Sequence, residues 1–189
     1  LNIESYNEFL KKCGVKGAFI SLPEEVVIPK NVMSIGNFAF IGCKNLAKVK
    51  ISDSVTKIGA FAFRECLNLT DVEIPNSVTS IEMGAFCTSG LKSVSILGPV
   101  KEIEMSTFLG CSKLTKVTLP DSVTRICHDA FNGCKNLKTI NIPTSVKAIE
   151  EDAFLGCTSL NSIAFNGNVY TSLDNFMHAF IAYQESHRQ

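Results

Sequence analysis

Hydrophobic residues return along the chain at a fixed interval. A leucine opens each period and a phenylalanine falls near its end, and the two landmarks keep the same register. The leucines are Leu46, Leu69, Leu91, Leu114, Leu137 and Leu160, and the phenylalanines are Phe40, Phe63, Phe86, Phe108, Phe131 and Phe154. Successive leucines are 22 or 23 residues apart. Two landmarks that recur together at this period predict a repeat architecture.

Each copy begins with an alternation of hydrophobic and polar positions. In the copy that starts at Leu69, Val72 and Ile74 are separated by one polar residue, which is typical of a strand buried on one side. Proline usually ends the alternation, because it cannot donate a hydrogen bond to a sheet. A Ser-Val-Thr stretch, an isoleucine and an Ala-Phe pair complete the unit. This return segment is too short for more than about one turn of helix.

A single unit cannot bury its own leucine, valine, isoleucine and phenylalanine. Stacked units would turn these positions into continuous columns, with each buried side chain contributing roughly 1.5–3 kcal/mol. The pattern therefore predicts an α/β-type repeat solenoid over residues 26–168, with about six repeats of 22–23 residues, one parallel sheet and short return segments. The first of these copies, from Val26, is partial.

The two flanks differ from the repeat and predict capping helices at both ends. Residues 1–25 are expected to form an N-terminal cap with a helix at about 5–13, since Ser5 and Glu8 form a capping-box pattern. Residues 169–189 are expected to form a C-terminal helix, with Thr171 and Asp174 in a similar pattern. Two roles stay open for the second helix: it caps the core, or it docks a partner or a neighbouring domain.

One copy is irregular. Between Phe86 and Leu91 it is one residue shorter than the others, and Pro99 falls two positions late. Because the leucine and isoleucine columns resume at once, we expect an altered turn here and no break in the stack. Ser52 and Asn166 stand where other copies have proline, which affects only the local turns.

Five of the eight cysteines occupy one position of the repeat, three residues after the phenylalanine: Cys43, Cys66, Cys111, Cys134 and Cys157. A position used identically in each copy faces the same interior column, where a free cysteine behaves as a small hydrophobic side chain. We therefore expect reduced core thiols. Neighbouring copies are close enough that disulfide pairing between them stays open as an alternative.

Charge and hydropathy exclude several classes of protein. Lys+Arg 18 and Asp+Glu 18 give no net charge, so no overall field favours nucleic acid or an anionic membrane. No apolar run approaches the roughly 20 residues that a membrane span needs, and no signal peptide is visible at the start. The chain begins at Leu1, which indicates a mature or trimmed fragment.

Candidate catalytic and metal-binding groups are few. Cys127, His128 and Asp129 are consecutive, but neighbouring residues on a tight turn point in diverging directions, whereas a catalytic Cys–His pair must reach hydrogen-bond distance. The three histidines have no metal-ligand spacing with one another or with a pair of cysteines. No glycine-rich phosphate loop precedes a helix. We expect no enzyme activity, no metal and no cofactor.

The repeat unit is approximately L-x-x-[VI]-x-[IL]-P-x-S-V-x-x-I-x-x-x-A-F-x-x-C, and the copy from Leu114 to Cys134 matches it throughout. Over about residues 26–168 the chain resembles the BspA-like leucine-rich repeat, also called the Treponema pallidum type. This resemblance implies a right-handed leucine-rich-repeat stack. It also implies secreted or cell-surface proteins that bind host proteins or other cells, and it brings no catalytic residues.

The polar residues that alternate with the buried column predict a binding surface along the sheet, because this wall is the usual contact surface of repeat stacks. They are Lys48, Lys50, Asp71, Glu73, Ser93, Ser95, Lys116, Thr118, Thr139 and Asn141. The row is mixed in charge and has no aromatic anchors, which favours an electrostatically oriented protein contact. We therefore expect a monomeric module that binds another protein, of host extracellular or cell-surface origin. The alternative is a stiff spacer that displays another domain and has no ligand.

Overall fold

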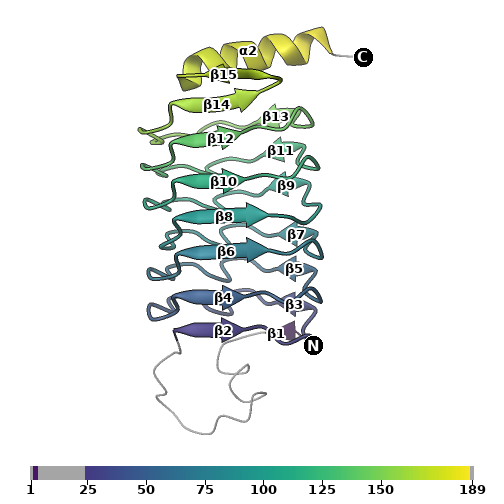
Figure 1. Cartoon of the computed structure of the whole chain (residues 1–189), viewed down its shortest axis with the longest axis vertical. Coiled ribbons are helices and arrows are strands. Elements are labelled where there is room, and N and C mark those ends of the chain that lie inside the picture. Colours follow the sequence, from purple (N-terminus) through teal and green to yellow (C-terminus); the bar gives the residue numbers. More distant parts are fainter. Residues whose placement is uncertain (1, 4–23, 188–189) are drawn as a thin grey trace, which may run out of the picture.

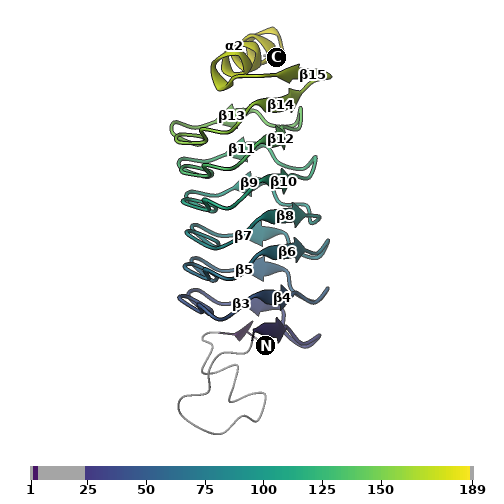
Figure 2. The same cartoon turned by 60° about the vertical axis from the view of Figure 1, so that its left-hand side comes forward.

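The computed structural model of the chain describes residues 2–3 and 24–187. They form an elongated solenoid in which each repeat makes one turn, and the first strand and the only helix of this part lie at opposite ends (Figures 1 and 2). The expected N-terminal helix at about 5–13 and Cys13 lie outside the described residues. Within the described part, one broad wall, one narrow wall and a tight corner enclose a single hydrophobic core.

The broad wall is an eight-stranded sheet in the order β15-β14-β12-β10-β8-β6-β4-β2. Its seven parallel strands come one from each turn, because each repeat carries the same alternation. They are β2 (Glu25–Val27), β4 (Lys48–Lys50), β6 (Asp71–Ile74), β8 (Ser93–Ile96), β10 (Lys116–Thr118), β12 (Thr139–Asn141) and β14 (Ser162–Phe165).

The narrow wall adds to the predicted parallel sheet. Its return segments also pair, as two short parallel sheets. One holds β1 (Asn2–Ile3), β3 (Ser34–Ile35), β5 (Lys57–Ile58) and β7 (Ser80–Ile81), and the other holds β9 (Glu102–Ile103), β11 (Arg125–Ile126) and β13 (Ala148–Ile149). A strand of two residues has no alternation to detect in a sequence, which explains why the pattern missed it.

The irregular copy separates these two sheets. The broad wall runs through it without interruption, since β6 and β8 pair over four residues from Asp71–Ser93 to Ile74–Ile96. On the narrow wall, Glu82 N–H donates to Ile58 O and Cys127 N–H to Ile103 O, but Glu104 N–H makes no such bond to Ile81 in residues 24–187. The expectation of a local change without a break in the stack is confirmed, and the change reaches the narrow wall.

The corner between the walls is built on the phenylalanine column. The rings of Phe40, Phe63, Phe86, Phe108, Phe131 and Phe154 stack with centroids 5.2–5.7 Å apart and planes within 10° of parallel. Backbone bonds follow the same column: Phe63 N–H donates to Ala85 O over 2.7 Å, for example. We call this row of rings the phenylalanine file. It holds the turns in register from one end of the core to the other.

The cysteine column lies beside the phenylalanine file, and the seven described cysteines are free thiols. Cys66, Cys111, Cys134 and Cys157 each donate from Sγ to the carbonyl of a phenylalanine in the preceding turn, over 3.1–3.2 Å. In the irregular copy Ser89 occupies this position, is buried, and shares a 3.3 Å hydrogen bond with Cys111. These thiols therefore hold structural positions in the core.

The C-terminal end is closed by a hairpin and a helix. After β14 the chain turns at Asn166 and Gly167, whose φ angles of 48° and 76° suit a tight hairpin turn, and β15 (Asn168–Tyr170) pairs antiparallel with β14. The helix α2 (Leu173–Ser186) follows, and Ser172, not Thr171, is its N-cap. Phe176 and Phe180 of α2 pack against Phe165 and bury the last turn of the core.

Candidate protein-binding wall

All ten residues predicted for the binding surface lie on the outer face of the broad sheet. We call this face the strand wall. Between them, Val49, Val72, Val94, Val117 and Ile140 point into the core and are buried. Of the ten, Ser93 and Ser95 are half-buried and the other eight are exposed. Because no described element covers the strand wall, these side chains are open to a partner (Figure 1).

Parallel pairing lines up the wall residues in rows across the strands. The first row contains Glu25, Lys48, Asp71 and Ser93 in Cα register. Lys48 Nζ lies 3.5 Å from Glu25, and Ser93 Oγ donates to Asp71 Oδ1 over 2.6 Å. The first row therefore satisfies part of its own charge: Lys48 pairs with Glu25, and Asp71 accepts a hydrogen bond from Ser93.

The second row leaves its charges unpaired. Lys50 on β4 and Glu73 on β6 make no ion pair and no side-chain hydrogen bond within residues 24–187. Lys116 on β10 belongs to the first row, in register with Ser93, and makes none either. Exposed charges of opposite sign on adjacent strands usually attract one another. The absence of an ion pair between Lys50 and Glu73 points to a local opening of the sheet between β4 and β6.

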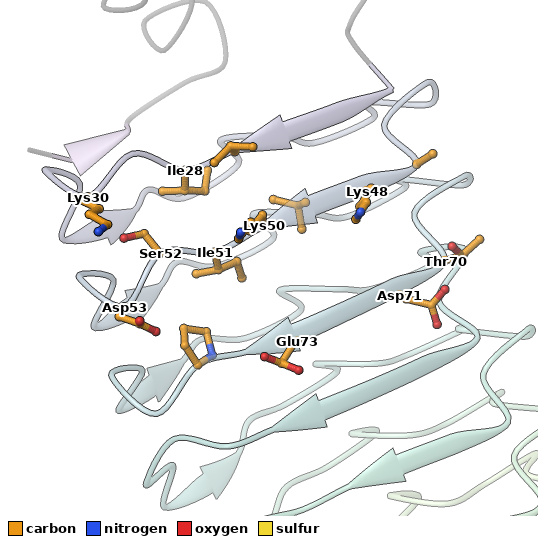
Figure 3. A pocket seen from close by; sticks show the side chains of 14 residues that line it. Ile28, Lys30, Lys48, Lys50, Ile51, Ser52, Asp53, Thr70, Asp71 and Glu73 are labelled. Carbon is orange, nitrogen blue, oxygen red and sulfur yellow. The ribbon is translucent and has the colours of Figure 1, made fainter.

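The broad sheet is incompletely paired between β4 and β6. Their Cα register holds one pair, whereas β2 and β4 share three and β6 and β8 share four. Ile28 N–H, just after β2, donates to Lys50 O over 2.9 Å, but the equivalent Ile51 N–H after β4 makes no backbone hydrogen bond in the described part. A hollow of about 930 Å³ opens here, and Figure 3 shows its lining.

A smaller hollow of about 240 Å³ lies where β10 and β12 pair over two residues. Here too a backbone bond of the ladder is missing, since Leu119 N–H makes none within residues 24–187, whereas Ile142 N–H donates to Ala164 O over 2.8 Å. Lys116, Thr118, Thr139 and Asn141 line this hollow. The strand wall thus has two recesses, and both contain residues predicted from the sequence.

The narrow wall uses its charges within the fold. Lys57 pairs with Glu82 of the next turn over 2.5 Å, and Arg125 pairs in the same way with Glu150. Each glutamate also accepts a backbone N–H from the preceding turn, Glu82 from Ala60 and Glu150 from His128. The N–H of His128 and then the guanidinium of Arg125 lower the pKa of Glu150. These two ion pairs connect consecutive turns, whereas Lys101, Glu102 and Glu104 make no ion pair within residues 24–187.

The Cys127–His128–Asp129 sequence does not form a nucleophile site. The thiol of Cys127 is buried and its contact is with Glu102 at 3.8 Å, while His128 Nε2 lies 3.2 Å from Asp129. Burial, followed by the nearby charge of Glu104, raises the pKa of Cys127 to about 12. A thiol with this pKa is protonated at neutral pH, so the group lacks an activated thiolate.

Two clusters bring potential metal ligands together, with ligand atoms within 4.8 Å of one another: Glu102, Glu104 and Cys127, and His128, Asp129 and Asp152. Exposed acidic groups gather in this way on many proteins without an ion. Neither cluster supplies a reason to revise the expectation of no metal.

Comparison with known proteins places this architecture in a family. The chain matches the model of the BspA type Leucine rich repeat region, in six copies, over residues 18–108 and 79–182. It belongs to the BspA-type leucine-rich-repeat family. This confirms the resemblance seen in the repeat unit. No curated protein matches the chain significantly.

Solved structures of related bacterial proteins share the BspA-type fold. A leucine-rich repeat protein from Bacteroides ovatus is 35% identical with a TM-score of 0.71, and the match covers 75% of this chain and 37% of that one. A leucine rich cell surface protein from Faecalibacterium prausnitzii is 36% identical with a TM-score of 0.64, covering 80% and 43%. The T. pallidum leucine-rich repeat protein is 29% identical with a TM-score of 0.50, covering 74% and 57%. The chain thus spans less than two thirds of each of these proteins.

Among the described residues, no helix is long and apolar enough to pass through a bilayer. The helix α2 has 14 residues and instead packs its aromatic face on the end of the solenoid.

Proposed function

We propose that this chain is a non-catalytic module that binds another protein through the strand wall, as part of a secreted or cell-surface protein. The observation that carries the proposal is the difference between the two walls. On the narrow wall two ion pairs, Lys57–Glu82 and Arg125–Glu150, link consecutive turns, and the hollow beside Lys101, Glu102 and Glu104 has only about 170 Å³. The strand wall leaves Lys50, Glu73 and Lys116 unpaired beside two recesses, the larger of about 930 Å³. Unpaired charge beside a recess orients and holds a charged partner.

Membership of the BspA-type family supports both parts of the proposal. Stacked repeats typically bind proteins on the extended surface that their strands create. The location is supported by the Faecalibacterium prausnitzii relative, which is described as a cell surface protein. We expect the partner to be a host extracellular or cell-surface protein, and the module itself to be monomeric.

The test is a comparison of two sets of charge-reversed variants. The wall set exchanges Lys50→Glu with Glu73→Lys, and separately changes Lys116→Glu. The control set exchanges Lys147→Glu with Glu151→Lys, two exposed residues away from the strand wall. Binding is measured by biolayer interferometry against a panel of purified host matrix and serum proteins. We expect the wall set to weaken binding at least about tenfold, and the control set to leave it unchanged.

The alternative function is a spacer without a ligand. A spacer must be stiff, and the continuous phenylalanine file gives the solenoid this stiffness. The spacer function predicts that no member of the panel binds, or that binding is the same for both sets of variants. Either result would remove the strand wall as the functional surface.

A further inference from the structure

We propose that the hollow between β4 and β6 is a groove for an extended peptide segment of a partner protein that carries neighbouring acidic and basic side chains. We call this hollow the β4–β6 groove. The inference rests on the proposed function, because it assigns a partner chemistry to one part of the strand wall. The argument uses the backbone of the groove, its charges, its floor and its size.

The backbone of the groove lacks two contacts that equivalent residues of other turns make. Ile51 N–H lacks the ladder bond that Ile28 and Ile142 make at the same position. One step further along the same pair of turns, the hydroxyl of Ser77 is buried without a partner in the described part. The equivalent Ser54 and Ser145 donate to the carbonyl of a valine in the preceding turn over 2.7 Å. The groove is thus a separation of two turns, and Ile51 N–H can donate to a peptide carbonyl there.

The groove is lined by charges of both signs: Lys50 on β4 and Glu73 on β6 are opposite in sign, and Lys30, Lys48, Asp53 and Asp71 also line it. Lys30, after β2, and Lys50, on β4, lie on one side, and Glu73 lies on the next strand, β6 (Figure 3). None of the three makes an ion pair within residues 24–187. A carboxylate of the ligand fits beside Lys50 and an ammonium or guanidinium fits beside Glu73. A ligand with charges of only one sign would be repelled by Lys50 or by Glu73. This disfavours phosphate and nucleic acid as ligands.

The floor of the groove is apolar and contains no aromatic ring. Ile28, Val49, Ile51 and Pro75 line it. An aliphatic floor accommodates the backbone of a peptide and the aliphatic part of its long side chains. Stacking of a planar ring or base needs an aromatic platform instead. The volume of about 930 Å³ lies within the usual range of ligand sites, roughly 300–1,000 Å³. The recess at β10 and β12 has about a quarter of this volume and has Lys116 with no acidic residue in its lining.

The experiment selects a random peptide library displayed on phage against the intact chain. Peptides that also bind the Lys50→Glu, Glu73→Lys variant are removed. We expect the remaining peptides to share neighbouring acidic and basic residues. Synthetic copies should bind the unmodified chain at least about tenfold more tightly than the variant by fluorescence anisotropy, and less tightly as salt increases.

The decisive experiment reverses the charges of the selected peptide. In this peptide each acidic residue is exchanged for lysine and each basic residue for glutamate. Because the variant has the charges of Lys50 and Glu73 exchanged, it should bind the charge-reversed peptide and restore most of the lost affinity. Circular dichroism and melting curves confirm that the variant is folded.

Three outcomes overturn the inference: no peptide is enriched, the enriched peptides carry one sign of charge, or the reversed peptide does not bind the variant. If any one of these outcomes occurs while Lys116→Glu still weakens binding of a host protein, the strand wall keeps its proposed function. Only the β4–β6 groove is then excluded as a peptide site. If both experiments fail, the proposed function fails as well.

Discussion

At the corner of each turn the backbone passes twice through the left-handed region. One column contains Phe38, Phe61, Gly84, Ser106, Asp129 and Asp152, and the other contains Gly42, Glu65, Thr88, Gly110, Gly133 and Gly156, with φ between 52° and 75°. A bulky residue in this region is strained. The strain at Phe61 is offset by its contacts, since its ring stacks on Phe38 at 5.5 Å and Arg64 lies over it at 5.7 Å.

Among the glycines of this corner, Gly84 has the least room for a side chain. A Cβ on Gly84 would lie 2.2 Å from Cε1 of Phe61, whereas a Cβ on Gly42 would meet nothing within 4 Å. Both glycines have positive φ, so both alanine variants carry the backbone cost of about 1 kcal/mol. We expect Gly84→Ala to lose about 1–3 kcal/mol more, measured by urea unfolding. Adding Phe61→Ala should remove most of the difference, and equal losses in the two single variants would contradict the packing argument.

The core thiols provide a second test at the scale of the residue. With a pKa of about 12, roughly one Cys127 thiol in ten thousand is ionised at pH 8, and burial also raises the pKa of Cys111 to about 12. In a Cys13→Ser background, we expect the five buried thiols with a raised pKa to resist iodoacetamide in the folded chain and to react in urea: Cys66, Cys87, Cys111, Cys127 and Cys134. Mass spectrometry counts the adducts. Rapid labelling of Cys127 in the folded chain would reopen the nucleophile hypothesis.

At the scale of the element, the narrow wall depends on links between consecutive turns. Glu150 is the best example, because it accepts the N–H of His128 and pairs with Arg125. Such links replace the long ladder that two-residue strands cannot form. They also make the narrow wall sensitive to acid.

The lowered pKa of Glu150 gives this sensitivity a direction. A carboxylate whose folded pKa lies below the ordinary value of 4.5 stabilises the fold above that pH, and the contribution is lost as the pH falls through the folded pKa. Glu150→Gln should therefore be less stable than the unmodified chain at pH 7, and the two should converge below pH 4.5. Urea unfolding across this range is the measurement. Glu151→Gln, an exposed neighbour, is the control and should show no such convergence.

The sequence predicted the elements that carry long patterns and missed those that do not. The strands of the broad sheet and the columns of Leu, Val, Ile and Phe follow directly from the repeat. The repeat pattern does not predict the hairpin of β14 and β15, although Asn166-Gly167 is a strong turn signal, because Asn166 occupies the position where other copies have proline. The β4–β6 groove has no sequence signal of its own. It arises from the spacing of two turns, which depends on the whole backbone.

At the scale of the whole molecule, the solenoid needs its end to be closed. The last parallel strand, β14, pairs with β15, and Phe165 is covered by Phe176, Phe180 and Tyr183 with ring centroids 5.0–5.8 Å away. An uncovered strand edge invites pairing with another chain. The hairpin and α2 therefore protect the stack from end-to-end association.

Truncation tests this protective role. A chain that ends at Asn166 loses β15 and α2 and exposes both Phe165 and the edge of β14. We expect it to melt at a lower temperature and to form dimers or larger species in light scattering after size exclusion. Ile181→Ser, a change on the exposed side of α2, should leave both properties unaltered. A truncated chain that stays monomeric with the same melting temperature would show that the end needs no cover.

The phenylalanine file also bears on how a chain of this kind can change in length. Each ring of the file stacks on the rings directly above and below it, at nearly the same spacing throughout. A unit duplicated in the gene would therefore find familiar neighbours wherever it was inserted, as long as its 22 or 23 residues stayed whole. Such a gene can lengthen by copying, and later divergence of the copied wall residues would create new contact surfaces without disturbing the core.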